Sequence, residues 1–68
     1  MVDTLELKSA MVRNDLTLYK LASMVGLSKA SLSYKVNNKR EFTVTEVVKV
    51  ARAMNLSNDE VHKIFFAK

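Results

Sequence analysis

The amino-acid sequence predicts an all-α fold in one small domain. The 68-residue chain contains no proline and one glycine, the two residue types that oppose a helix most strongly. An N-cap residue followed by glutamate three positions later, which is the spacing of a capping box, occurs three times: Asp3 and Glu6, Thr43 and Glu46, Ser57 and Glu60. Apolar residues make up 49% of the chain, enough for one core, so residues 1–68 are expected to form one domain.

The first predicted helix covers residues 4–13. Leu7 and Met11 are one helical turn apart, with Ala10 beside them, so the three side chains share one face. The helix is expected to break at residues 14–15, an Asn-Asp pair.

Two shorter helices are predicted over residues 18–25 and 29–36. Thr17 and Ser28 are their expected N-cap residues, because a hydroxyl oxygen accepts a hydrogen bond from a free N–H of the first turn. Gly26 separates them, since glycine adopts the left-handed conformation that ends many helices. The residues expected to face inward are Leu18, Leu21, Ala22, Val25, Leu27, Leu32 and Val36.

Asn37 and Asn38 are expected to stop the third helix, because asparagine tolerates left-handed geometry. A fourth helix then begins after Thr43 and includes Met54. Valine is a mediocre helix former, so a strand over residues 43–50 is an alternative. The capping box and the helical spacing of the apolar residues favour the helix.

The fifth predicted helix begins after Ser57 and carries Val61, Ile64 and Phe65 at helical spacing. Phe65 and Phe66 are adjacent and cannot both face the same core. We therefore expect Phe65 to point inward and Phe66 outward. An exposed phenylalanine would indicate a surface for a partner. The alternative is that both rings fold over the core of this small domain.

The excess positive charge is concentrated on one segment. Residues 16–40 contain five basic residues and no acidic one, whereas the rest of the chain contains six basic and seven acidic residues. The basic residues of this segment are Lys20, Lys29, Lys35, Lys39 and Arg40. Such a surface attracts a polyanion through the release of counterions, so the segment indicates DNA binding.

Residues 20–36 resemble the helix-turn-helix of the Cro and phage-repressor superfamily. Ala22 lies where the two helices would cross closely, Gly26 follows four positions later, and Leu32 is an apolar residue six positions after the glycine. The flanking predicted helices extend the resemblance over nearly the whole chain. It implies a compact five-helix, lambda-repressor-like domain that acts as a sequence-specific transcriptional regulator, in the manner of a small phage-encoded Cro-like repressor.

The family pattern also implies how such a protein would act. A homodimer would bind a nearly palindromic operator in double-stranded DNA, in the cytoplasm of a bacterial host and associated with its nucleoid. The second helix of the motif would lie in the major groove. Base contacts are then expected from Ser28, Lys29, Ala30, Ser31, Ser33 and Tyr34. Phosphate contacts are expected from Thr17, Tyr19, Lys35, Asn38, Lys39 and Arg40. The dimer contact is expected from Phe65 and Phe66.

The chemistry of these residues suits those roles. Lys29 can donate to guanine O6 and N7, and Ala30 is small enough to touch a thymine methyl group. The competing interpretation is that they are small, solvated helix residues. The chain departs from the family at Val36 and Asn38, where many relatives have glutamate and then glycine. Lys35 occupies a site that is often apolar, so we expect Val36 to take the apolar role and Lys35 to reach outward.

Other classes of function find little support in the sequence. His62 is the only histidine and there is no cysteine, so no zinc site is expected. No nucleophile lies beside a base and no glycine-rich phosphate loop is possible, so we expect neither an enzyme nor a cofactor. The lack of cysteine fits a reducing cytosol, and no apolar run could span a membrane. The alternative function is an antirepressor-like or antitoxin-like module that binds a protein partner through its last two helices.

Overall fold

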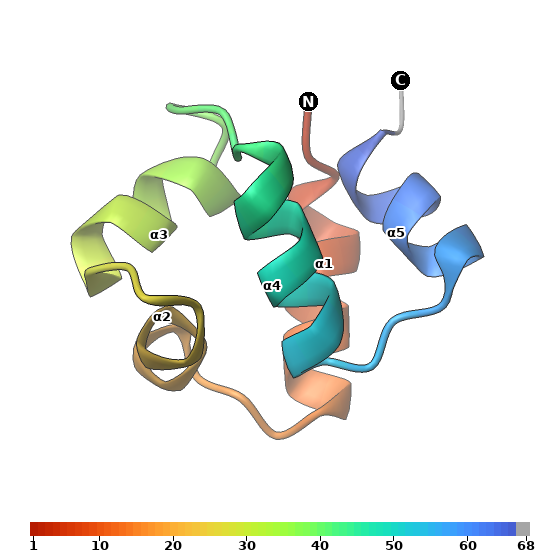
Figure 1. Ribbon diagram of the computed structural model, residues 1–68, viewed down its shortest axis with the longest axis horizontal. Helices are drawn as coiled ribbons and strands as arrows, with labels where there is room; N and C mark the ends of the chain where they lie inside the picture. The colour runs from red at the N-terminus through yellow and green to blue at the C-terminus, as the bar shows by residue number, and fades with distance from the viewer. Residues whose placement is uncertain (67–68) are drawn as a thin grey trace.

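The computed structural model describes residues 1–66, which form five α-helices and contain no strand (Figure 1). The helices are α1 (Thr4–Arg13), α2 (Leu18–Val25), α3 (Lys29–Val36), α4 (Val44–Ala53) and α5 (Asn58–Phe65). The all-α prediction is therefore confirmed. The alternative of a strand over residues 43–50 is wrong, because α4 covers most of that segment.

A side-chain cap begins every helix. The cap oxygen accepts a hydrogen bond of 3.0–3.2 Å from the backbone N–H three positions later, and the caps are Asp3, Thr17, Ser28, Thr43 and Ser57. The capping boxes of α4 and α5 are reciprocal, as predicted. The box at Asp3 is only half formed. The backbone N–H of Asp3 donates instead to the carbonyl of Ile64 at 2.7 Å, so the Glu6 carboxylate is not needed there.

Four of the helices end in the same way, with a residue in the left-handed region just beyond the last turn. These residues are Asp15, Gly26, Asn38 and Asn55, with φ between 50° and 75°. The next residue donates its N–H to a carbonyl five positions back at 2.8–2.9 Å, which satisfies an orphan carbonyl of the last turn. At three ends that next residue is a half-buried leucine, the usual apolar contact. At the end of α3 it is Lys39, which is exposed.

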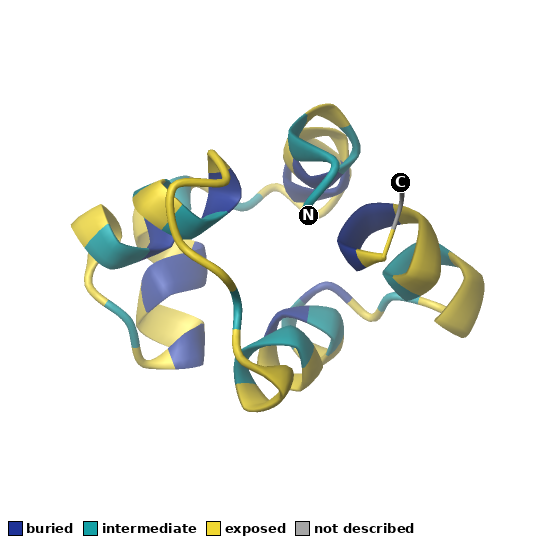
Figure 2. Ribbon diagram, turned by 90° about the horizontal axis from the view of Figure 1, so that it is seen from above, coloured by how far each residue is buried: buried dark blue, intermediate teal, exposed yellow. Residues whose placement is uncertain are grey.

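The core lies between the helices, whose buried surfaces face the middle of the molecule (Figure 2). Its most deeply buried large side chains are Leu7, Leu21, Leu32, Val36, Val50 and Ile64. Helix α2 packs against α3 and α4, and α1 packs against α5. Phe65 closes one end of the core by meeting Phe42 edge to face, with 5.3 Å between ring centroids.

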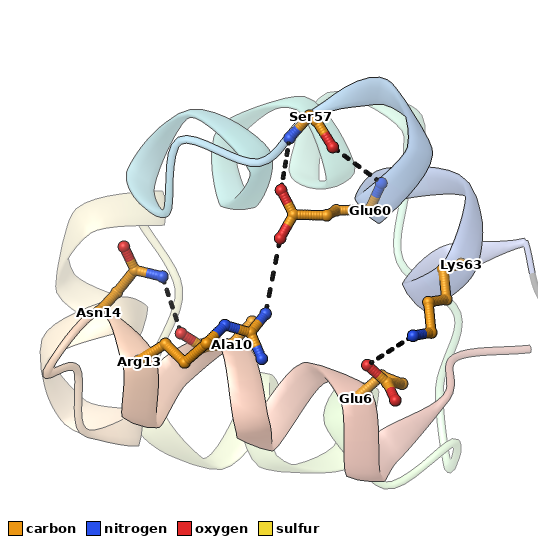
Figure 3. Close-up of polar contacts among 7 residues, drawn as sticks. All are labelled: Glu6, Ala10, Arg13, Asn14, Ser57, Glu60 and Lys63. Carbon is orange, nitrogen blue, oxygen red and sulfur yellow. Dashed lines mark hydrogen bonds and ion pairs between the residues drawn. The ribbon is translucent and has the colours of Figure 1, made fainter.

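Two ion pairs join α1 to α5 on the side of the molecule remote from α3 (Figures 1 and 3). Arg13 lies 3.5 Å from Glu60, and Lys63 lies 3.5 Å from Glu6. The Ser57 backbone N–H and hydroxyl also hydrogen-bond Glu60 and lower the pKa of its carboxyl. Much of the acidic charge is thus held on the α1–α5 side.

Candidate nucleic-acid interface

The arrangement of α2 and α3 is consistent with the predicted helix-turn-helix. In Figure 1, α2 is seen nearly end on while α3 runs across the view, so the two helices cross steeply. Gly26 makes the turn with φ 75°, and Ala22 is buried, as a close crossing of the helices requires. Leu27 is half-buried beneath the turn.

One face of α3 is open to solvent. Leu32 and Val36 are buried on the inner face, while Lys29, Ala30 and Tyr34 are exposed on the outer face. Among the remaining residues predicted to contact bases, Ser28 is exposed and caps the helix, and Ser33 is half-buried at the edge of the open face. Ser31 is also half-buried but lies one turn before Lys35, on the flank that turns toward α4, which makes it the least accessible of the six.

Asn37 belongs to the same face and was not among the predicted contacts. It follows Ser33 by one helical turn, and its side-chain amide donates to the Ser33 carbonyl at 2.9 Å. With Ser33, Tyr34 and Lys39 it lines a shallow hollow at the end of α3. The four-residue spacing from Ser33 is the signal in the sequence that could have identified it.

The prediction that Lys35 reaches outward is wrong. Its ammonium donates to Glu46 Oε1 at 2.5 Å, and the two side chains are only 12% and 16% exposed. The same carboxylate oxygen accepts the Thr43 backbone N–H of the α4 capping box at 2.9 Å. The hydrogen bond from Lys35, together with that from Thr43, holds the pKa of Glu46 below its ordinary value near 4.5. Lys35 therefore fastens α3 to the start of α4 and is removed from the phosphate contacts.

Asn38 also has a structural role in place of the predicted phosphate contact. Its side chain accepts from the Val2 N–H and donates to the Val2 carbonyl, both at 2.8 Å. The Thr4 hydroxyl donates to the Val36 carbonyl at 2.7 Å. These bonds tie the end of α3 to the segment that precedes and begins α1.

Lys39 and Arg40 remain at the surface beside the open face of α3. Both are exposed, and both donate their backbone N–H groups to the Tyr34 carbonyl, at 2.8 Å and 3.3 Å. The Arg40 guanidinium lies over the Tyr34 ring, 5.1 Å from its centroid. The loop therefore presents two cations next to the exposed face of α3.

The start of α2 offers a second set of polar groups. Thr17 caps the helix by accepting the Lys20 N–H at 3.1 Å, and Tyr19 is 70% exposed. The first N–H groups of a helix have no partner within it, and the helix dipole makes that end favourable for an anion. Thr17 and Tyr19 thus lie at a helix end that favours an anion.

The basic residues of this region keep their charge available. Within residues 1–66, Lys35 is the only one of the five basic residues of the 16–40 segment that lies within 4.0 Å of a carboxylate. Lys20, Lys29, Lys39 and Arg40 are exposed. Exposed cations that are not paired with a carboxylate of the described residues therefore lie around α3, whereas the ion pairs between α1 and α5 lie on the other side of the molecule.

The predicted dimer contact at Phe65 is wrong. Phe65 is only 5% exposed, because its ring packs on Phe42 inside the core. Phe66 is 56% exposed and points away from the core, as expected from its position next to Phe65. Of these two phenylalanines, only Phe66 has a ring at the surface that a partner could contact.

The described residues form neither a metal-ion cluster nor a membrane-spanning helix. Residues 1–66 include no group of three or more histidine, aspartate or glutamate side chains placed to hold a metal ion. In the same part of the chain, no helix has the length and apolar character needed to cross a membrane.

Fold and surface together define a small, all-helical protein with one basic helix face. The chain belongs to the family described as "Protein of unknown function (DUF739)", whose model matches residues 2–68. No significant match was found among curated proteins.

Proposed function

We propose that this protein is a sequence-specific DNA-binding transcriptional regulator, similar to a Cro-like phage repressor, that inserts α3 into the major groove. One observation carries the proposal: the exposed face of α3 bears small and polar side chains and is bordered at both ends by cations that, among the described residues, have no carboxylate within 4.0 Å. An α-helix with its side chains is about 10–12 Å across, so the major groove, about 12 Å wide, can admit it.

The side chains on this face divide into two kinds of contact. Ala30 and Ser33 are short, so they allow the helix backbone to approach the base edges. Lys29 at the start of α3 supplies a donor for guanine O6 and N7. These residues would carry the sequence preference, whereas phosphate contacts would fix the position of the protein without reading sequence.

Phosphates would meet the protein on both sides of α3. Thr17 and Tyr19 at the start of α2 offer a helix N-terminus on one side. Lys39 and Arg40 supply positive charge on the other side. Lys35 and Asn38 are left out of this interface because their side chains are held by Glu46 and Val2.

The size of the domain favours a homodimer on DNA. The molecule measures 26 × 24 × 21 Å, which is less than the roughly 34 Å of one DNA turn. One copy would therefore cover one half-site, and two copies would read a near-palindrome. The exposed Phe66 ring makes the end of α5 our candidate for the contact between copies. Occupation of the operator in the cytoplasm of a bacterial host would then block transcription sterically.

A second candidate function rests on a groove between α4 and α5. Its lining is mostly apolar and consists of Val47, Val48, Ala51, Arg52, Asn55, Leu56, Asn58 and Val61. Such a groove suits an antirepressor-like or antitoxin-like module that masks a protein partner. Salt separates the two functions, because phosphate contacts weaken steeply as salt rises while apolar contacts do not.

The decisive experiment is selection of bound duplexes from a random DNA pool at about 150 mM salt, near physiological ionic strength. We expect an enriched near-palindrome with half-sites about one turn apart. Binding to that sequence should fall steeply between about 50 and 200 mM salt. Recovery of no enriched sequence would refute the regulator proposal and favour the protein-partner function.

A further inference from the structure

Tyr34 was expected to contact a base, yet it makes three contacts with the loop that follows α3. Its carbonyl accepts the N–H groups of Lys39 and Arg40, and its ring lies under the Arg40 guanidinium, 5.1 Å from centroid to Cζ. We propose that Tyr34 is a positioning residue that holds Arg40 ready for a DNA phosphate, rather than a residue that reads a base. The inference rests on the proposed DNA-binding function and reassigns one residue within it.

The cation–π contact leaves the hydrogen-bonding groups of Arg40 available. It acts between the charge of the guanidinium and the π electrons of the ring, so it uses none of the N–H donors as a hydrogen bond would. Those donors match the oxygens of a phosphate in a paired, planar geometry. No carboxylate of the described residues lies within 4.0 Å to compete for them.

The backbone that carries Arg40 is fixed as well. Asn38 adopts φ 63° and is held by two hydrogen bonds to Val2, and the two following N–H groups are held by Tyr34. A flexible arginine loses much conformational freedom when it binds, and this loss weakens binding. The Tyr34 ring and the loop restrict Arg40 before DNA binds, so less conformational entropy is lost when the phosphate contact forms.

The test uses Tyr34→Ala, Tyr34→Phe, Arg40→Ala and the double-alanine variant, with Lys8→Ala as a control of equal charge on the exposed surface of α1. Affinity for a duplex of about 30 base pairs of fixed sequence is measured by fluorescence anisotropy between about 50 and 200 mM KCl. A non-specific duplex suffices, because it reports phosphate contacts.

We expect Arg40→Ala to reduce the slope of log K against log salt by about 0.9, the value for one phosphate contact. Tyr34→Ala should weaken binding about 2- to 5-fold, as expected for loss of a cation–π contact, and should also reduce the slope although it removes no charge. Tyr34→Phe should retain both affinity and slope, because it keeps the ring. The double variant should bind like Arg40→Ala alone, and Lys8→Ala should leave the slope unchanged.

Two results of the binding experiment would overturn the positioning role. Tyr34→Ala could weaken binding at an unchanged salt slope, or Tyr34→Phe could lose as much affinity as Tyr34→Ala, which would make the hydroxyl group the contact. NMR relaxation of the Arg40 Nε–H group in the free protein adds a readout that needs no DNA. That group should be ordered in the wild type and in Tyr34→Phe, and disordered in Tyr34→Ala. Equal mobility in all three refutes the positioning role, whereas a wild-type protein that binds no duplex refutes the proposed function.

Discussion

Replacing Lys35 with methionine should destabilise the protein far more than a comparable change at its surface. Methionine matches the apolar part of the lysine side chain up to Cε but leaves the Glu46 carboxylate without its ammonium partner. Both side chains are at least 84% shielded from water, as their exposures of 12% and 16% indicate, so solvent screens the pair little. A hydrogen bond to a charged group contributes about 1.5–3 kcal/mol. Release of the ordered lysine chain offsets part of that, so we expect a net loss of about 1–2 kcal/mol.

For a domain of this size, such a loss lowers the melting temperature by about 5–15 °C. Circular dichroism at 222 nm during heating at pH 7 measures it. The matched control is Lys63→Met, which removes a pair with Glu6 whose side chains are 66% and 35% exposed. Exposed pairs contribute at most about 0.5–1 kcal/mol, so this control should lose only a few degrees.

A double variant completes the test. Glu46→Gln added to Lys35→Met removes the uncompensated charge while an amide oxygen remains to cap α4, so part of the lost stability should return. Equal melting temperatures for Lys35→Met and Lys63→Met would refute the reasoning, since burial of the pair would then have no energetic consequence. A double variant that is less stable than Lys35→Met would refute it as well.

Three further predictions follow from the site and its supports. Lys29→Ala should weaken binding to the selected operator by about 1–3 kcal/mol and relax the preference at one base pair, whereas Lys8→Ala on the exposed surface of α1 should do neither. Equal losses of affinity in an anisotropy titration would refute the proposal that α3 contacts the bases. Gly26→Ala should lose about 1–2 kcal/mol in a urea titration through its φ of 75° alone, because an added Cβ would meet nothing within 4 Å; a stability equal to the wild type would contradict this. Because the pKa of Glu46 is lowered in the folded protein, its contribution to stability is complete above the unfolded pKa near 4.5 and is lost as the pH falls through the folded pKa. The melting temperature should therefore decrease less between pH 7 and pH 2 for Lys35→Met than for the wild type. An equal decrease in both proteins would contradict the pairing.

Helix boundaries were predictable from the sequence because caps act locally. Thr17 and Ser28 bond to N–H groups three positions away, and Gly26 sets its own backbone conformation, so no distant partner is needed to place α2 and α3. The burial of Leu32 likewise follows from spacing along one helix.

The site was predictable only in part. The predictions that were wrong concern residues whose partners are far away in the sequence. Lys35 is removed from the surface by a carboxylate eleven positions later. Asn38 stays exposed, but its side-chain amide is held by the backbone of Val2. Phe65 is removed from the surface by Phe42, which lies on the loop before α4. Periodicity identifies which residues share one face of a helix. It does not identify which distant residue will pack against that helix, because tertiary packing decides this.

The pairing of α1 with α5 has a consequence for the order of folding. Helices α2, α3 and α4 follow one another along the chain and pack together, so their contacts close short loops. The bond from Asp3 to Ile64 and the ion pairs of Figure 3 close a loop that includes nearly the whole chain, which costs the most chain entropy. We expect this closure to form after the central helices have docked and to open first. Hydrogen exchange in α1 and α5 would then proceed through a partial opening that leaves the α2–α3 unit intact.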